Sequence, residues 1–136
     1  MMNYDDIMPM RSDVAYLLFL KAYELDISCH VLTENFAYFN FNDFQFNLYK
    51  NNGYHCRLVD MGRNDLGLVE QPLKFCLFCE DRTRLEQFKH EMQLSTRQSL
   101  SAVYSGMYTL EFTQSPSNVE DAEDDDTDLI QKYLLV

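Results

Sequence analysis

The sequence predicts an α+β fold in which two tandem βαβββ modules form an open, curved sheet that bears a cleft. Three observations favour it. Each half of the chain shows a short apolar run, then helical periodicity, then further strand-like runs. Residues 36–49 alternate between apolar and other side chains, which is typical of paired strands. A βαβββ unit covers one sheet face with its helix, so two units placed side by side leave inner faces free for a cleft.

The first module begins with an apolar run at residues 7–10, which we predict as a strand. A helix is predicted over residues 14–25, because apolar residues recur there at three- and four-residue spacing. Asp13 or Ser12 can cap this helix by accepting hydrogen bonds from its first free amides.

Residues 36–49 are predicted as a β-hairpin. The polar pair at residues 42–43 supplies a two-residue turn between the alternating runs. One face of the second run is wholly apolar, and the other carries two amides and a phenol: Gln45, Asn47 and Tyr49. Such a polar face either meets solvent or lines a cavity.

The second module repeats the order of the first. A short strand over residues 54–59 and a linker over residues 61–71 lead to a strand over 73–79 and a helix over 81–92. Residues 61–71 contain two glycines and an Asn-Asp pair, which is a composition typical of a loop.

Thr83 and Glu86 have the spacing of a capping box at the start of the second helix. Two strands over residues 101–104 and 108–113 follow, joined by a Ser-Gly turn. Residues 129–136 are apolar enough to form a closing strand.

The length of 136 residues fits one domain. We therefore predict a single domain over residues 1–136. Its first module covers about residues 1–60 and its linker residues 61–71. Its second module covers about residues 72–136 and includes an acidic loop at residues 119–128.

The net charge of −11 is concentrated in that loop. Seven acidic residues lie between positions 120 and 128 with no basic residue among them. The other residues hold 15 acids and 11 bases, a net charge of −4. A block of like charge is usually solvated, although it also suits a cation-binding or protein-docking arm. An acidic chain is poorly suited to the phosphate backbone, so we expect no nucleic-acid partner.

The sequence favours a cytoplasmic protein with no membrane partner. No window approaches the roughly 18 consecutive apolar residues that a transmembrane helix requires. The first six residues carry two acids and no basic residue, unlike a secretory signal.

Four cysteines are expected to be reduced and packed in the core: Cys29, Cys56, Cys76 and Cys79. The last two have the spacing of a zinc knuckle. On a strand, however, residues three apart point to opposite faces, so these thiols would not converge on one metal ion.

Several strings resemble the vicinal oxygen chelate superfamily, which includes glyoxalase I, extradiol dioxygenases and bleomycin-resistance proteins. Residues 7–13 are similar to the opening strand and helix cap of that family, and residues 36–49 to its aromatic hairpin. Residues 73–81, followed by Leu85 and Phe88, resemble the start of its second module. This resemblance implies the two-module fold.

In the enzymes of that family, four inward strand positions hold a divalent metal. By resemblance these positions fall near Asp6, Asn47 and Lys74, with the fourth near Glu111 or in the final strand. An amide is a weak ligand, and a lysine ammonium has no lone pair to offer. We therefore expect no metal, no cofactor and no catalytic residue, and we lean against an enzyme.

The resemblance then implies a non-catalytic, bleomycin-resistance-like protein that sequesters an aromatic or cationic small molecule in the cleft of a homodimer. Aromatic walls offer stacking and cation–π contacts, and polar side chains orient the ligand. The candidate ligand-binding residues are Tyr38, Gln45, Asn47, Tyr49, Phe78, Tyr108 and Glu111. Core packing is the competing role for each aromatic side chain. The alternative functions are an acidic protein–protein interaction module and a divergent metal-dependent lyase or dioxygenase-like enzyme.

Overall fold

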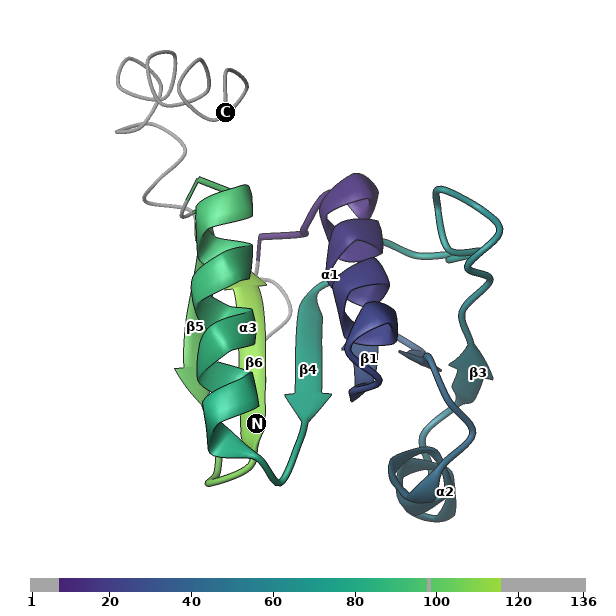
Figure 1. The fold of residues 1–136 in the computed structure, drawn as a ribbon. Helices are drawn as coiled ribbons and strands as arrows, with labels where there is room; N and C mark the ends of the chain where they lie inside the picture. The colour runs from purple at the N-terminus through teal and green to yellow at the C-terminus, as the bar shows by residue number, and fades with distance from the viewer. Residues whose placement is uncertain (1–7, 98, 116–136) are drawn as a thin grey trace.

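Six strands form one open sheet in the computed structural model, which describes residues 8–97 and 99–115 (Figure 1). The described part is a mixed α/β fold, compatible with the predicted α+β class. Its elements in chain order are α1 (Ser12–Glu24), β1 (Ser28–Leu32), β2 (Ala37–Phe39), α2 (Phe44–Asn51), β3 (Cys56–Leu58), β4 (Lys74–Phe78), α3 (Arg82–Ser95), β5 (Leu100–Tyr104) and β6 (Thr109–Gln114).

The strand order across the sheet is β3-β2-β1-β4-β6-β5. The β2–β3 pair is parallel, and the other four pairs are antiparallel. The central contact joins β1 to β4 over five residue pairs, from Ser28 opposite Phe78 to Leu32 opposite Lys74. Because β1 and β4 come from different halves of the chain, both halves build one continuous sheet.

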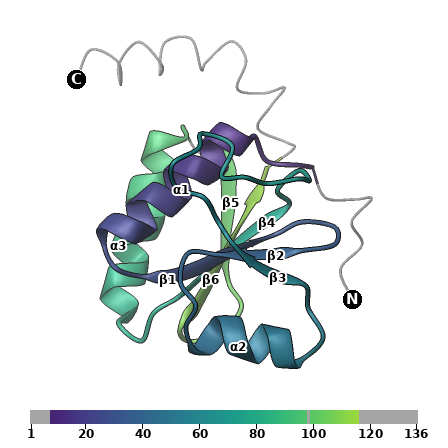
Figure 2. The same cartoon turned by 90° about the vertical axis from the view of Figure 1, so that its right-hand side faces the viewer.

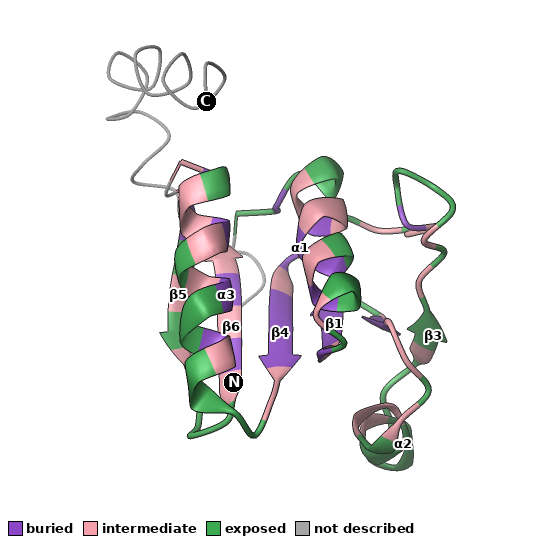
Figure 3. Ribbon diagram, viewed as in Figure 1, coloured by how far each residue is buried: buried purple, intermediate pink, exposed green. Residues whose placement is uncertain are grey.

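Helices α1 and α3 lie side by side and cover one face of the sheet, whereas α2 lies apart from them (Figures 1 and 2). Alternate residues of the central strands face these two helices and form the main core. Phe75 of β4 packs against both helices that cover this face of the sheet. Its ring lies 5.1 Å from that of Phe19 in α1 and 6.4 Å from that of Phe88 in α3. Figure 3 shows the middle of β4 as buried, with intermediate residues at its two ends.

The two long helices are confirmed at the predicted places, but their caps differ from the predictions. Asp81 caps α3 by accepting hydrogen bonds from the Thr83 and Arg84 amides, at 3.1 and 3.4 Å. Thr83 already lies inside the helix, so the predicted capping box is wrong. The cap position of α1 is Arg11, which makes no side-chain capping bond.

The predicted hairpin over residues 36–49 is wrong in its second half, which forms α2. Asp43 accepts a hydrogen bond from the Phe46 amide at 3.2 Å and so begins a helix. Phe46 and Tyr49, three residues apart, then share one helix face and pack against Phe39. The residues of α2 therefore show both the alternation expected of a strand and the three-residue spacing expected of a helix.

The antiparallel partner of β2 is β1, a strand that the sequence analysis did not predict. Four of the five residues of β1 are buried, on both faces of the sheet. Ser28, Cys29, His30 and Val31 alternate between polar and apolar side chains, but the run is only four residues long. So short a run is ambiguous as a strand signal.

The remaining strands agree with the predictions. β3 lies within residues 54–59, β4 within 73–79, and β5 and β6 cover the last two runs almost to the residue. The linker over residues 61–71 contains no helix or strand. Residues 8–10 form no strand.

Residue 7, the acidic loop at 119–128 and the predicted strand at 129–136 lie outside the described residues. The repeat of two βαβββ modules stays a prediction. The described second half gives β4, α3, β5 and β6 in that order, whereas α2 stands where the first half was expected to have a strand.

Candidate functional site

The sheet face turned away from α1 and α3, called the open face below, carries one row of side chains across five strands. Cross-strand pairing aligns Phe39, His30, Cys76, Glu111 and Val103 in that order. Directly opposed residues point to the same face, so these five side chains are neighbours. Burial falls along the row, from 0% exposed at Phe39 to 59% at Val103.

Helix α2 covers the buried end of this row. Tyr49 places its ring 5.5 Å from Phe39 and 4.6 Å from the His30 imidazole, measured between ring centres. Phe46 adds a contact with Phe39 at 5.4 Å. The open face is therefore divided into a half covered by aromatic rings, at β2 and β1, and a half, at β6 and β5, that no helix of residues 8–97 and 99–115 covers.

An ion pair lies between the two halves. Lys74 Nζ is 3.0 Å from Glu111 Oε1, and the two side chains are 20% and 25% exposed. Lys74 precedes Cys76 by two residues in β4, which places it on the same face. Since the pair is only partly desolvated, the ammonium remains accessible to a further anionic group.

The buried groups of the row are neutral at pH 7. Burial, and then the charge of Lys74, lowers the pKa of His30 to about 4, and its Nε2 has no hydrogen-bond partner within the part of the chain that the structure describes. Burial raises the pKa of the Cys76 thiol to about 12 and that of the Tyr49 phenol to about 12. A protonated thiol or phenol is a weak nucleophile. The face is thus suited to contact and orient a polar group.

Of the positions that the resemblance assigned to a metal, the structure brings Lys74 and Glu111 together but not Asn47. Asp6 lies outside the described residues, and Asn47 is exposed on α2, where its amide donates to the Asp43 carbonyl at 2.9 Å. Lys74 and Glu111 bind each other. Among residues 8–97 and 99–115, no group of three or more His, Cys, Asp or Glu side chains could hold a metal ion.

Three of the seven predicted ligand-binding residues lie on or above the open face. Glu111 is in the row, Phe78 follows Cys76 on the same face of β4, and Tyr49 covers His30. Tyr38 instead points into the main core, is 1% exposed, and accepts a hydrogen bond from the Val69 amide at 3.3 Å.

The other three predicted residues do not join this row. Gln45 and Asn47 lie on α2, where Asn47 is exposed. Tyr108 lies just before β6, is 38% exposed, and its carbonyl accepts a hydrogen bond from the Cys79 amide at 3.0 Å.

Sequence reasoning missed His30 and Cys76 as members of the site, and considered Lys74 only as a poor metal ligand. The alternation in β4 contains the signal for two of them, because Lys74, Cys76 and Phe78 alternate with core residues. His30 lies in β1, where it alternates with the core residues Cys29 and Val31, but this short run was not predicted as a strand.

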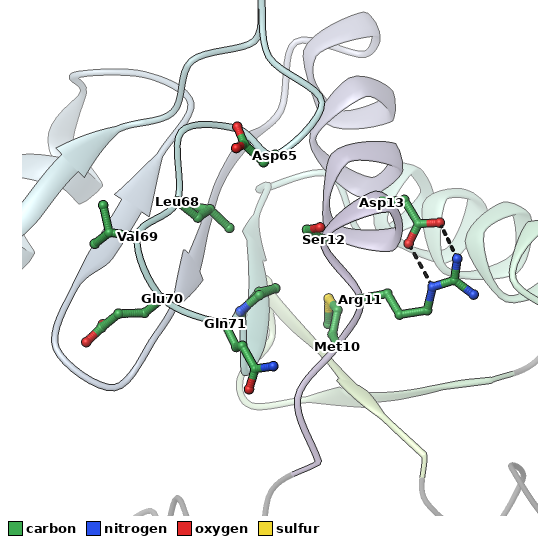
Figure 4. Close-up of a pocket in the computed structure, with 10 residues that line it drawn as sticks. Met10, Arg11, Ser12, Asp13, Asp65, Leu68, Val69, Glu70 and Gln71 are labelled. Atoms are coloured by element: carbon green, nitrogen blue, oxygen red, sulfur yellow. Dashed lines mark hydrogen bonds and ion pairs between the residues drawn. The ribbon is translucent and has the colours of Figure 1, made fainter.

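A groove of about 670 Å³ lies at one end of the sheet, between the start of α1 and the loop before β4 (Figure 4). Acidic groups predominate in its lining. Its one arginine, Arg11, is bound to Asp13 at 2.8 Å, and Asp65 and Glu70 lie on the loop side. This negative lining is poorly suited to a phosphate group.

Glu70, which lines the groove, links the loop before β4 to the turn between β1 and β2 through hydrogen bonds. Its Oε1 accepts hydrogen bonds from the Thr33 hydroxyl at 2.6 Å and the Asn35 amide at 2.9 Å, and its Oε2 accepts from the Asn35 side chain. These hydrogen bonds lower the pKa of the Glu70 carboxyl, because they stabilise its charged form.

Both ends of the described part lie at this same end of the sheet (Figures 1 and 2). Near one end, the Met10 amide donates to the Pro72 carbonyl at 2.9 Å, just before β4 begins. At the other, the Ser115 amide donates to the Ser99 carbonyl at 2.8 Å, just after β6. Because β6 runs antiparallel to β4, the end of β6 lies beside the start of β4.

No family model and no curated protein matches this sequence. Solved structures do match its fold. A haloacid dehalogenase-like (HAD-like) hydrolase from Bacteroides thetaiotaomicron is 13% identical with a TM-score of 0.64, over 79% of this chain and 40% of that chain. A HAD-like hydrolase from B. subtilis is 11% identical with a TM-score of 0.61, over 79% and 46%. A phosphatase of the HAD enzyme superfamily from Bacteroides thetaiotaomicron is 13% identical with a TM-score of 0.56, over 95% and 44%.

These matches overturn the resemblance to the vicinal oxygen chelate superfamily, and with it the predicted glyoxalase-like or bleomycin-resistance-like function of sequestering a ligand without chemistry. The short strings behind it, an apolar strand followed by a capped helix, occur in many α+β folds. The most specific string, residues 36–49, forms β2 and α2.

Within the described residues, α1, α2 and α3 all lack the length and apolarity needed to cross a bilayer.

The chain spans less than half the length of the hydrolases it matches. It therefore shares its fold with part of the HAD-like hydrolases.

Proposed function

We propose that this chain is one structural unit of a HAD-like phosphatase and contributes its open face to the substrate site of a phosphoryl-transfer enzyme. The fold similarity to HAD-like hydrolases, one of them described as a phosphatase, carries the proposal. The matched hydrolases contain further structure, because the chain spans 40% to 46% of their lengths. We assign the bond-breaking groups of the proposed enzyme to a unit of that kind.

The positions of the two ends support such an arrangement. Both ends of the described part lie at one end of the sheet, beside the groove. A second unit attached there needs only short connections and leaves the sheet itself intact. Domains whose ends lie close together tolerate insertion into other structures.

The chemistry of the open face supports a role in positioning the substrate. A phosphoester is an anion, and Lys74 is a point charge at the boundary of the covered and uncovered halves. Glu111 holds the ammonium in place and can also accept a hydrogen bond from a hydroxyl group of the substrate. Cys76 and Tyr49 remain protonated, so they supply polar surface rather than a nucleophile.

A domain exchange tests the proposal. Residues 8–115 replace the structurally matching segment of the B. subtilis hydrolase, and hydrolysis of p-nitrophenyl phosphate is measured. We expect the chimera to be active. Lys74→Met should raise its KM at least about tenfold through loss of a charge-assisted contact. Lys50→Met, at an exposed lysine of α2, is the matched control and should leave KM unchanged.

Two results would contradict the proposal. One is a folded chimera, verified by circular dichroism, that has no phosphatase activity. The other is an active chimera in which Lys74→Met and Lys50→Met have the same KM. The second result would leave the shared fold in place but remove the open face from the substrate site.

A further inference from the structure

Helix α2 is attached to the sheet by few contacts. It has eight residues, and none of them is buried. In Figure 3 it shows only intermediate and exposed residues, unlike α1 and α3. Its packing against the sheet depends on Phe46 and Tyr49, which join a small cluster separate from the main core. A helix held in this way can open without unfolding the rest of the domain.

The imidazole of His30 lies directly beneath this helix. It is 6% exposed and lies between two rings, stacked on Phe39 at 4.5 Å and tilted against Tyr49 at 4.6 Å. Its Nε2 has no hydrogen-bond partner among the described residues. An imidazolium at this place would have a buried N–H donor with no acceptor, which is costly unless the group becomes hydrated.

The charged groups around His30 do not offset this cost. Lys74 of β4 opposes a positive charge, and its partner Glu111 of β6 is occupied by that ion pair. Asp43, at the start of α2, favours the charged form, but burial has the larger effect. Two further titratable groups, Cys76 and Tyr49, stay neutral across the acidic range. β2 contributes the uncharged Phe39.

We propose that α2 is an acid-released flap: protonation of His30 detaches the helix from the sheet and uncovers the β2 and β1 half of the open face. The ring of Tyr49 then no longer covers the imidazole, and water can hydrate both of its N–H groups. This inference rests on the geometry of α2 alone and does not depend on the proposed function.

The expected size of the effect follows from proton linkage. The pKa of His30 is about 4 when it is covered, and an exposed histidine has a pKa of about 6.5. Between pH 8 and pH 5 the equilibrium constant for opening should therefore rise about 30-fold. Helices α1 and α3, which cover the main core, have no such group beneath them.

Hydrogen exchange of the full chain tests the proposal, with rates corrected for the intrinsic effect of pH. We expect the amides of residues 47–51 in α2 to lose about 30-fold in protection between pH 8 and pH 5, through an opening that depends only weakly on urea, and to be less protected than the amides of α1 and α3 at both pH values. His30→Phe, which keeps an aromatic ring in the stack, should abolish the loss. His55→Phe, at an exposed histidine, should retain it.

Two further measurements keep the test decisive. The NMR titration of the His30 ring in the unaltered chain should show opening coupled to its protonation, whether or not His30→Phe folds. Asp43→Asn keeps a capping side chain but removes the nearby carboxylate, and release should persist. The proposal is overturned if α2 protection does not change with pH, if the α2 amides are as strongly protected and as sensitive to urea as those of α1 and α3, or if Asp43→Asn abolishes the release.

Discussion

At the scale of single residues, partners that are distant in the sequence decide what each polar side chain does. Glu70 lies in a loop whose composition is that of a simple linker, yet its carboxylate accepts hydrogen bonds from Thr33 and Asn35 in the turn between β1 and β2. Similarly, Lys74 and Glu111 are 37 positions apart and meet only because β4 pairs with β6. Sequence patterns assign a face to such residues, but not a partner.

Replacing Glu70 with Gln should weaken the attachment of the loop and reduce the effect of acid on stability. The pKa of Glu70 is lowered in the folded state, so its contribution is present above the unfolded pKa of about 4.3 and is lost as pH falls through the folded value. Urea unfolding of Glu70→Gln at pH 7 and pH 3 should show less loss of stability on acidification than the unaltered chain.

Glu34→Gln is the control, because Glu34 is an exposed acid in the same turn. It should leave the pH dependence unchanged. Equal pH dependence in Glu70→Gln and the unaltered chain would show that the hydrogen bonds of Glu70 do not contribute to folding stability.

At the scale of the elements, sequence patterns predict α1, α3, β5 and β6 from their periodicity and β4 as a continuous apolar run. They fail for β1, whose polar–apolar alternation covers only residues 28–31, and for α2, whose residues alternate as in a strand although Phe46 and Tyr49 have helical spacing. Asp43 marks α2 as a helix, since a capping carboxylate two to three residues before free amides is a local signal. The alternation of the flanking residues outweighed this signal.

The two aspartate caps should differ in their effect on stability. Asp81→Ala removes two hydrogen bonds at the start of α3, a helix that packs against the main core, and should cost about 1 kcal/mol of unfolding free energy. Asp43→Ala frays α2, which can open locally. Its effect should be confined to hydrogen exchange of α2, with a smaller change in the urea midpoint.

Asp60→Ala is a suitable comparison, since Asp60 accepts a backbone hydrogen bond from Gly62 in a loop rather than at a helix start. A midpoint for Asp43→Ala as low as that of Asp81→Ala would mean that α2 unfolds together with the core, contrary to its separate cluster of contacts.

At the scale of the whole molecule, the pairing of β1 with β4 joins the two halves of the chain into one sheet and one core. Sequence order could not show this, since it divides the chain at the linker, while the strands of the two halves meet at the centre. The row from Phe39 to Val103, and so the candidate site, exists only after this pairing.

Phe75 therefore offers a test of whether the halves fold together. Its ring contacts Phe19 of the first half and Phe88 and Phe112 of the second. Phe75→Ala should cost about 3–5 kcal/mol through lost burial and the cavity that remains. Because one core spans both halves, the loss should lower the stability of the whole described fold in a single cooperative transition.

The measurement is urea unfolding followed by far-ultraviolet circular dichroism and by tyrosine fluorescence, which is usable because the chain contains nine tyrosines and no tryptophan. Both signals should shift together. Phe78→Ala, at a half-buried phenylalanine on the opposite face of the same strand, should shift them less, since fewer of its contacts are with the core. Two separate transitions in Phe75→Ala would instead support modules over residues 1–60 and 72–136 that fold independently.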